Sequence, residues 1–197
     1  MKVGVLALQG DVPEHRRALS GLVPPADIVA VRHPSDLTDL EAILMPGGES
    51  TTIAALLRET GLWAPLLDRL RQGLGALATC AGLIVLAREL EPGPTGKDPP
   101  TMGLLDVKVR RNDYGPQRES FEAPVKVDGL GGPAFPGVFI RAPRILKVGE
   151  KASPFAHRGR EVVGIRSGRL WGLTFHPELT VDPRIHELFL SQLRRGG

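Results

Sequence analysis

The stretch Gly75-Ala-Leu-Ala-Thr-Cys80-Ala-Gly82 decides the fold, because it runs from a short apolar segment through a cysteine into the start of a helix. Gly75 to Thr79 has the composition of a buried strand, and the helix is expected to begin near Gly82 and to end by Pro92. Small residues surround the cysteine, as a tight turn between strand and helix requires. A strand that leads directly into a helix is the repeating unit of an α/β fold.

The residues before this stretch repeat the alternation of strand and helix. Strands are expected at residues 2–8, 27–32 and 41–45, and helices at residues 13–21, 50–59 and 63–72. The first strand is almost continuously apolar, a pattern typical of parallel strands that helices cover on both faces. We therefore predict a three-layer α/β/α fold with a mainly parallel sheet.

The second half of the chain is richer in strands. Residues 91–100 contain several prolines and glycines and are expected to form an exposed loop. Further strands are predicted at residues 104–110, 121–127, 138–141, 145–148, 162–166 and 170–175, and a last helix at residues 183–195. Ser167-Gly168 predicts a tight hairpin turn between the last two strands. No linker is long enough to divide the chain, so residues 1–197 are expected to form one domain.

Composition narrows the class of protein. Apolar residues make up 42% of the 197 residues and charged residues 24%, which is close to the globular average. No apolar run is long enough to span a bilayer, and the first residues lack the layout of a signal peptide. A net charge of +3 without a basic run argues against nucleic acid as a partner. We expect a soluble protein of the cytoplasm, with neither membrane nor nucleic acid among its partners.

Cys80 is the first residue that could carry chemistry. On a strand-turn-helix elbow its thiol would project from the carboxyl edge of the sheet, beside free backbone N–H groups. A lone cysteine in an apolar stretch is equally often an ordinary core residue. The elbow therefore needs a base before it indicates a nucleophile.

His176 is the histidine best placed to be that base. It follows a predicted strand, and Glu178 stands two residues later, so an extended backbone would put both side chains on one face. An imidazole needs such an acceptor to fix its tautomer. We predict a relay of Cys80, His176 and Glu178. The other histidines lie in polar or helical surroundings, with no acidic partner placed to orient them, and are expected to have surface or capping roles: His15, His33, His157 and His186.

The segment Pro46-Gly-Gly-Glu-Ser-Thr51 follows another predicted strand. Its glycines leave backbone N–H groups free to face a ligand, and Ser50 is expected to cap the next helix. A phosphate loop is disfavoured, because the lysine of the Walker pattern is missing. We predict an oxyanion hole formed by the N–H groups of Gly47 and Ala81. No group of residues has metal-ligand spacing, so no metal is expected.

With these motifs the chain resembles the glutaminase subunit of pyridoxal 5′-phosphate synthase, within the class I (triad) glutamine amidotransferases. The resemblance rests on residues 4–15, Pro46–Thr51, Thr79–Leu83, Arg111-Asn112, Gly137–Pro143 and Phe175–Thr180. Many relatives have glycine two residues before the nucleophile, where this chain has Ala78. The resemblance implies a flavodoxin-like glutamine amidotransferase fold, hydrolysis of L-glutamine to L-glutamate and ammonia through a cysteine thioester, and no cofactor.

The resemblance also implies roles and a partner. Cys80, His176 and Glu178 would be the catalytic residues, and the glutamine site would be lined by Gly48, Glu49, Ser50, Arg111, Ile140 and Arg141. The partner would be the barrel-shaped synthase subunit, assembled with this chain in a large hetero-oligomeric ring for vitamin B6 synthesis. Residues 9–15 lie at the carboxyl end of a predicted strand and are a docking candidate.

Three alternatives remain open at the level of sequence. The chain could be a glutaminase that serves another synthetase, which an added-synthase assay would reveal. It could be a cysteine-based redox sensor or chaperone on a similar fold, for which Glu49 and Arg111 would be dispensable. It could also be a catalytically silent scaffold, which would release no glutamate with any partner.

Overall fold

The computed structural model describes residues 1–93, 98–111 and 120–195. The strands are β1 (Val3–Leu6), β2 (Ile28–Val31), β3 (Ala42–Met45), β4 (Gly75–Thr79), β5 (Ala87–Leu90), β6 (Leu105–Arg110), β7 (Phe121–Val127), β8 (Phe135–Phe139), β9 (Arg144–Val148), β10 (Ser153–Arg158), β11 (Glu161–Ser167) and β12 (Leu170–Leu173). The α-helices are α1 (Val12–Leu19), α2 (Ser50–Glu59), α3 (Trp63–Arg71), α4 (Ala81–Leu86) and α5 (Arg184–Arg195), and the 3-10 helices include η4 (Pro177–Leu179).

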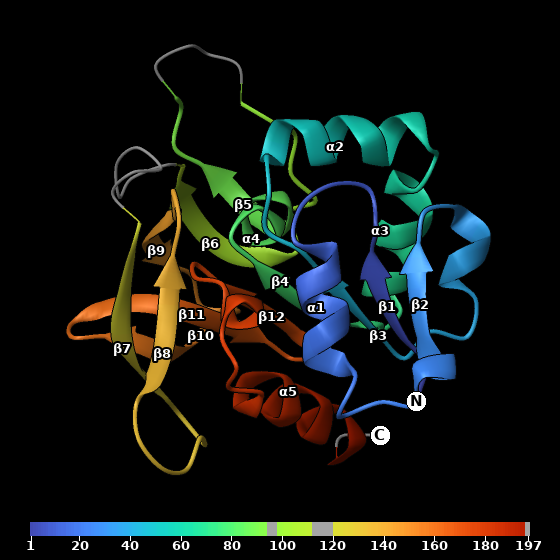
Figure 1. Ribbon diagram of the computed structural model, residues 1–197. Coiled ribbons are helices and arrows are strands. Elements are labelled where there is room, and N and C mark those ends of the chain that lie inside the picture. The colour runs from blue at the N-terminus through green and yellow to red at the C-terminus, as the bar shows by residue number, and fades with distance from the viewer. Residues whose placement is uncertain (94–97, 112–119, 196–197) are drawn as a thin grey trace.

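A nine-stranded sheet forms the centre of the molecule, in the order β2-β1-β3-β4-β12-β11-β10-β7-β8 (Figure 1). The strands from β2 to β12 in this order run parallel, and those from β12 to β8 pair antiparallel. A smaller sheet, β5-β6-β9, lies beside it. The predicted α/β fold with a mainly parallel sheet around Cys80 is confirmed, and the antiparallel extension corresponds to the strand-rich second half of the sequence.

Helices cover both faces of the parallel strands, as the apolar strand sequences predict. In β3 the side chains of Ala42 and Leu44 belong to the hydrophobic cluster that α1 and α5 cover. Ile43 and Met45 belong to the cluster on the opposite face, which α2, α3 and α4 cover. Successive residues of a strand point to opposite faces, so one four-residue strand fills two cores. Within the described residues, no helix has both the length and the apolar character needed to cross a membrane.

The largest differences from the prediction are two element boundaries and one missed strand. The helix after Cys80 ends at Leu86 and gives way to β5, because no glycine or proline marks that end and β5 is only four residues long. Strand β10 was missed, since Pro154 and an irregular register hide its strand pattern. Strand β8 begins at Phe135, three residues before the predicted start of 138.

The loop predicted at residues 91–100 is less exposed than expected. Among its described residues only Pro92 is exposed and Pro99 is buried, while residues 94–97 lie outside the described part of the chain. The hairpin predicted at Ser167-Gly168 is confirmed, because Ser167 pairs directly with Leu170 and Gly168 has a φ of 56°.

The register of the parallel strands positions the site. Met45 of β3 pairs with Ala78 of β4, and Leu173 of β12 pairs with Thr79. The segments after β1, β3, β4 and β12 therefore meet at one edge of the sheet. These segments contain the motifs that the sequence singled out.

Candidate active site

Cys80 stands at the junction of β4 and α4. Its backbone has φ 48° and ψ −101°, a left-handed conformation that side chains rarely adopt. The Cys80 N–H donates to Leu173 O at 2.9 Å, and its carbonyl accepts from Ile84 N–H. A Cβ on Gly82 would collide with the backbone of Met45, so the turn requires glycine there. The predicted elbow is therefore present, and its thiol lies near Ile140 O at 3.9 Å.

His176 and Glu178 are brought together directly after β12. His176 Nδ1 lies 2.9 Å from Glu178 Oε1, and both side chains are buried. The His176 backbone is extended and donates its N–H to Val138 O at 2.8 Å, while η4 carries Glu178. His176 and Cys80 line the same cavity of about 320 Å³. The structure thus places the three predicted catalytic side chains in one site.

The pKa values of the acid and the imidazole move in opposite directions. Burial alone would lower the pKa of His176, but hydrogen bonds with Asp11, Cys80 and Glu178 outweigh it and hold that pKa well above 6.5. Burial alone would raise the pKa of Glu178, but the neighbouring His15 and His176 hold it well below 4.5. A charged imidazole therefore faces an ionised carboxylate.

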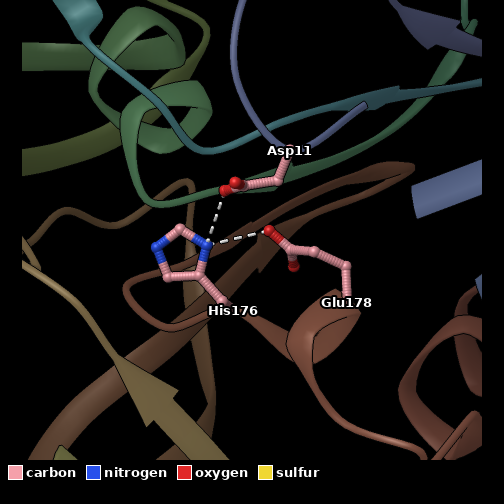
Figure 2. A group of neighbouring side chains, drawn as sticks. All are labelled: Asp11, His176 and Glu178. Atoms are coloured by element: carbon pink, nitrogen blue, oxygen red, sulfur yellow. Dashed lines mark hydrogen bonds and ion pairs between the residues drawn. The ribbon is translucent and has the colours of Figure 1, made fainter. Parts of the chain in front are cut away.

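Asp11 is a member of the site that the sequence reasoning did not single out. Its Oδ2 lies 3.2 Å from His176 Nδ1, so two carboxylates converge on one nitrogen (Figure 2). Asp11, His176 and Glu178 have ligand-type atoms within 4.8 Å of one another, a grouping that the sequence spacing did not reveal. His176 Nδ1 is already hydrogen-bonded to both carboxylates, and no metal remains our expectation.

His15 and His186 correct the expectation of surface or capping roles. Both are buried, His15 on α1 and His186 on α5. His15 Nε2 lies 3.4 Å from Glu178 Oε1, and its Nδ1 lies 3.4 Å from His186 Nε2. Burial and the neighbouring His15 lower the pKa of His186 to about 3. The only signal in the sequence for the role of His15 was its position on α1, which directly follows the Gln9–Asp11 segment at the end of β1.

The glycine loop after β3 differs in detail from the prediction. The N–H of Gly47 donates to Thr79 Oγ1 at 3.0 Å, so this predicted oxyanion donor already has a partner. Gly48 is exposed and lines the cavity, whereas Ala81 is buried at the first position of α4. Glu49, and not Ser50, caps α2, because its carboxylate accepts from Thr52 N–H at 3.0 Å.

The residues predicted to bind glutamine all line the cavity that contains Cys80: Gly48, Glu49, Ser50, Arg111, Ile140 and Arg141. Arg111 lies 3.4 Å from Glu49 Oε1 and 3.3 Å from Asp98 Oδ1. Arg141 has a φ of 45°, which turns the chain beside the cavity. Asn112, which belonged to the same motif, lies outside the described residues. A site with an arginine and a carboxylate can hold both ends of an amino acid.

Comparison with known proteins decides the family. The model of the SNO glutamine amidotransferase family matches residues 5–195. The chain belongs to this family.

Individual relatives are similar to this SNO family member over almost its whole length. The pyridoxal 5′-phosphate synthase subunit PdxT of Thermococcus kodakarensis is 49% identical across 98% of both chains. The PdxT subunit of Deinococcus radiodurans is also 49% identical, across 97% of this chain and 96% of its own. A crystal structure of a glutamine amidotransferase superposes with a TM-score of 0.88 at 42% identity, covering 98% of this chain and all of the other.

Proposed function

We propose that this chain is the glutaminase subunit of a pyridoxal 5′-phosphate synthase. It hydrolyses L-glutamine to L-glutamate and ammonia and delivers the ammonia for vitamin B6 synthesis in the cytoplasm. The observation that carries the proposal is one cavity in which the Cys80 elbow meets the His176–Glu178 pair. The choice of synthase rests on two relatives that are 49% identical over nearly the full length and are named as subunits of pyridoxal 5′-phosphate synthase.

The chemistry follows from the three side chains. With His176 already protonated, the sulfur of Cys80 reacts as the thiolate and attacks the amide carbon of glutamine. The C–N bond breaks as His176 gives its proton to the leaving nitrogen, which departs as ammonia and leaves a thioester on Cys80. The now neutral His176 takes a proton from water, the resulting hydroxide attacks the thioester, and glutamate leaves as the Cys80 thiolate re-forms beside the protonated imidazole. Glu178 keeps Nδ1 protonated and stabilises the imidazolium throughout.

The oxyanion of each tetrahedral intermediate needs donors near Cys80. We assign the N–H groups of Gly48 and Ala81, with Gly48 in place of Gly47, because the Gly47 amide is held by Thr79. Ala81 is the residue after the nucleophile and begins α4. The amide of a residue in this position points back toward the nucleophile in a strand-turn-helix elbow.

Recognition of the amino-acid end of glutamine falls to the charged rim of the cavity. Arg111 and Arg141 offer cations to the substrate carboxylate, and Glu49 offers a carboxylate to its ammonium group. Because Glu49 also contacts Arg111, substrate binding would replace part of an existing ion pair with two new ones. Ser50 and Ile140 complete the wall around the side-chain amide.

Ammonia free in water would be largely protonated, so the product must pass directly to the partner. We place the barrel synthase subunit, in a hetero-oligomeric ring, against residues 9–15 at the carboxyl edge of the sheet. Gln9 and Asp11 line the cavity, so a partner docked there would sit at its mouth. His15 is buried and would take no direct part in that contact.

Glutamate release with and without the cognate synthase tests the proposal. Wild-type protein with the synthase should release glutamate, and Cys80→Ala should release none. Glutamate release by Cys80→Ala would refute the nucleophile assignment. Activity with a different synthetase alone would make the chain the glutaminase of that enzyme, and no release with any partner would make it a scaffold.

A further inference from the structure

The hydroxyl of Thr79 stands at the centre of a buried hydrogen-bond network behind the site. Thr79 precedes the nucleophile and is fully buried. Its Oγ1 lies 3.1 Å from Glu178 Oε1, 3.0 Å from Gly47 N and 3.2 Å from His15 Nε2. These three partners come from η4, from the loop after β3 and from α1. One hydroxyl therefore joins three separate segments of the chain.

The direction of the Thr79 proton follows from counting donors and acceptors. A hydroxyl has one hydrogen to donate and two lone pairs that accept. The Gly47 N–H can only donate, and it takes one lone pair. If His15 Nε2 carries a hydrogen, this N–H donates to the other lone pair of the Thr79 hydroxyl. The Thr79 hydrogen is then left for Glu178 Oε1, which as a carboxylate oxygen can only accept.

His186 fixes the hydrogen on His15. His186 is buried, its Nε2 lies 3.4 Å from His15 Nδ1, and among the described residues its own Nδ1 has no hydrogen-bond partner. Buried N–H groups without a partner are rare, so the hydrogen of His186 belongs on Nε2, where it donates to His15 Nδ1. His15 then carries its own hydrogen on Nε2, which faces Thr79 and Glu178.

We propose that Thr79 and His15 are positioning residues of the glutaminase reaction, which fix Glu178 Oε1 where it holds His176 Nδ1. This inference rests on the proposed function. Glu178 Oε1 lies within 3.4 Å of donors from His176, Thr79 and His15. Thr79 and His15 thus fix the position of Glu178 Oε1, which in turn fixes the tautomer and orientation of His176. Neither positioning residue lines the cavity, so neither touches the substrate.

The same hydroxyl also holds the glycine loop. Because Thr79 accepts the Gly47 N–H, the peptide that leads into Gly48 is fixed relative to Glu178. A single side chain thus sets both the orientation of the imidazole and the place of the proposed oxyanion donor. Loss of the hydroxyl should therefore lower kcat and leave KM almost unchanged, since both effects act on the transition state.

Two pairs of variants test this role in the complex with the synthase. Thr79→Val keeps the shape and removes the hydroxyl, while Thr79→Ser keeps the hydroxyl. We expect Thr79→Val to lower kcat by about 10- to 100-fold with KM within about twofold, and Thr79→Ser to stay within about threefold of wild type. His15→Met and His15→Gln form the second pair, because glutamine retains an N–H donor and methionine does not.

Melting temperatures separate positioning from folding. Each variant is assayed well below its own Tm, and if Thr79→Val does not fold, the His15 pair decides. Equal kcat for wild type and Thr79→Val, or equal losses in Thr79→Val and Thr79→Ser, would overturn the positioning role. So would equal losses in both His15 variants. Wild-type protein without glutaminase activity in the complex would instead overturn the proposed function.

Discussion

The backbone at Cys80 predicts that glycine is more stable than alanine at this position. Cys80 has φ 48° and ψ −101°, outside the regions that side chains readily occupy. Holding a residue with a Cβ in such a region costs about 1–3 kcal/mol. Glycine avoids this cost but loses about 0.5–1 kcal/mol through its more flexible unfolded chain. Cys80→Gly should therefore exceed Cys80→Ala in free energy of unfolding by about 1 kcal/mol.

The comparison isolates the backbone, because both variants lack the sulfur. Urea unfolding measures the difference directly, and in thermal unfolding it corresponds to a Tm higher by about 2–4 °C for a protein of this size. Ala55→Gly is the matched control. Ala55 is exposed in the middle of α2, where the same exchange should destabilise by about 1 kcal/mol. If Cys80→Ala were as stable as Cys80→Gly, the elbow would not be strained and the reasoning would fail.

Further expectations concern the side chains and the loop around His176. Asp11→Asn removes a carboxylate 3.2 Å from His176 Nδ1 and should lower the pKa of His176, so the alkaline limb of kcat should move to lower pH; an unmoved limb would contradict this. Gly47→Ala would press a methyl group against the His176 ring and should reduce kcat by at least about tenfold, while Gly21→Ala, where a Cβ meets no atom within 4 Å, should be neutral. Arg111→Met should raise KM for glutamine by about tenfold or more and spare kcat; an unchanged KM would remove Arg111 from the substrate site.

The parts of the site that could be predicted from sequence are those encoded by short spacing. Cys80 lies in a strand-turn-helix segment whose residues are adjacent in the chain. His176 and Glu178 are two residues apart, so an extended backbone alone suggests their contact. The strands β1, β3 and β4 were predictable for the same reason, because their apolar runs are local signals.

The parts that were missed depend on packing between distant segments. His15 and Glu178 are 163 positions apart, from 178 minus 15, and meet only because α1 packs against η4. Asp11 reaches His176 for a similar reason. The Gly47 N–H was predicted to be an oxyanion donor, but it donates to Thr79 Oγ1. In the sequence Thr79 has only the pattern of a strand residue, so this contact could not be predicted. Strand β10 escaped because its pairing with β7 and β11 overrides the proline within it.

Transfer of the amide nitrogen tests the central claim most directly. The protein and the cognate synthase are given amide-¹⁵N glutamine together with the sugar phosphate substrates and an excess of unlabelled ammonium. The account predicts that the synthase product carries ¹⁵N with wild-type protein, and that Cys80→Ala abolishes the label. A product that carries only unlabelled nitrogen with the wild-type protein would contradict the transfer of ammonia from glutamine to the synthase. Equal labelling with Cys80→Ala would contradict the role of Cys80 in releasing that ammonia.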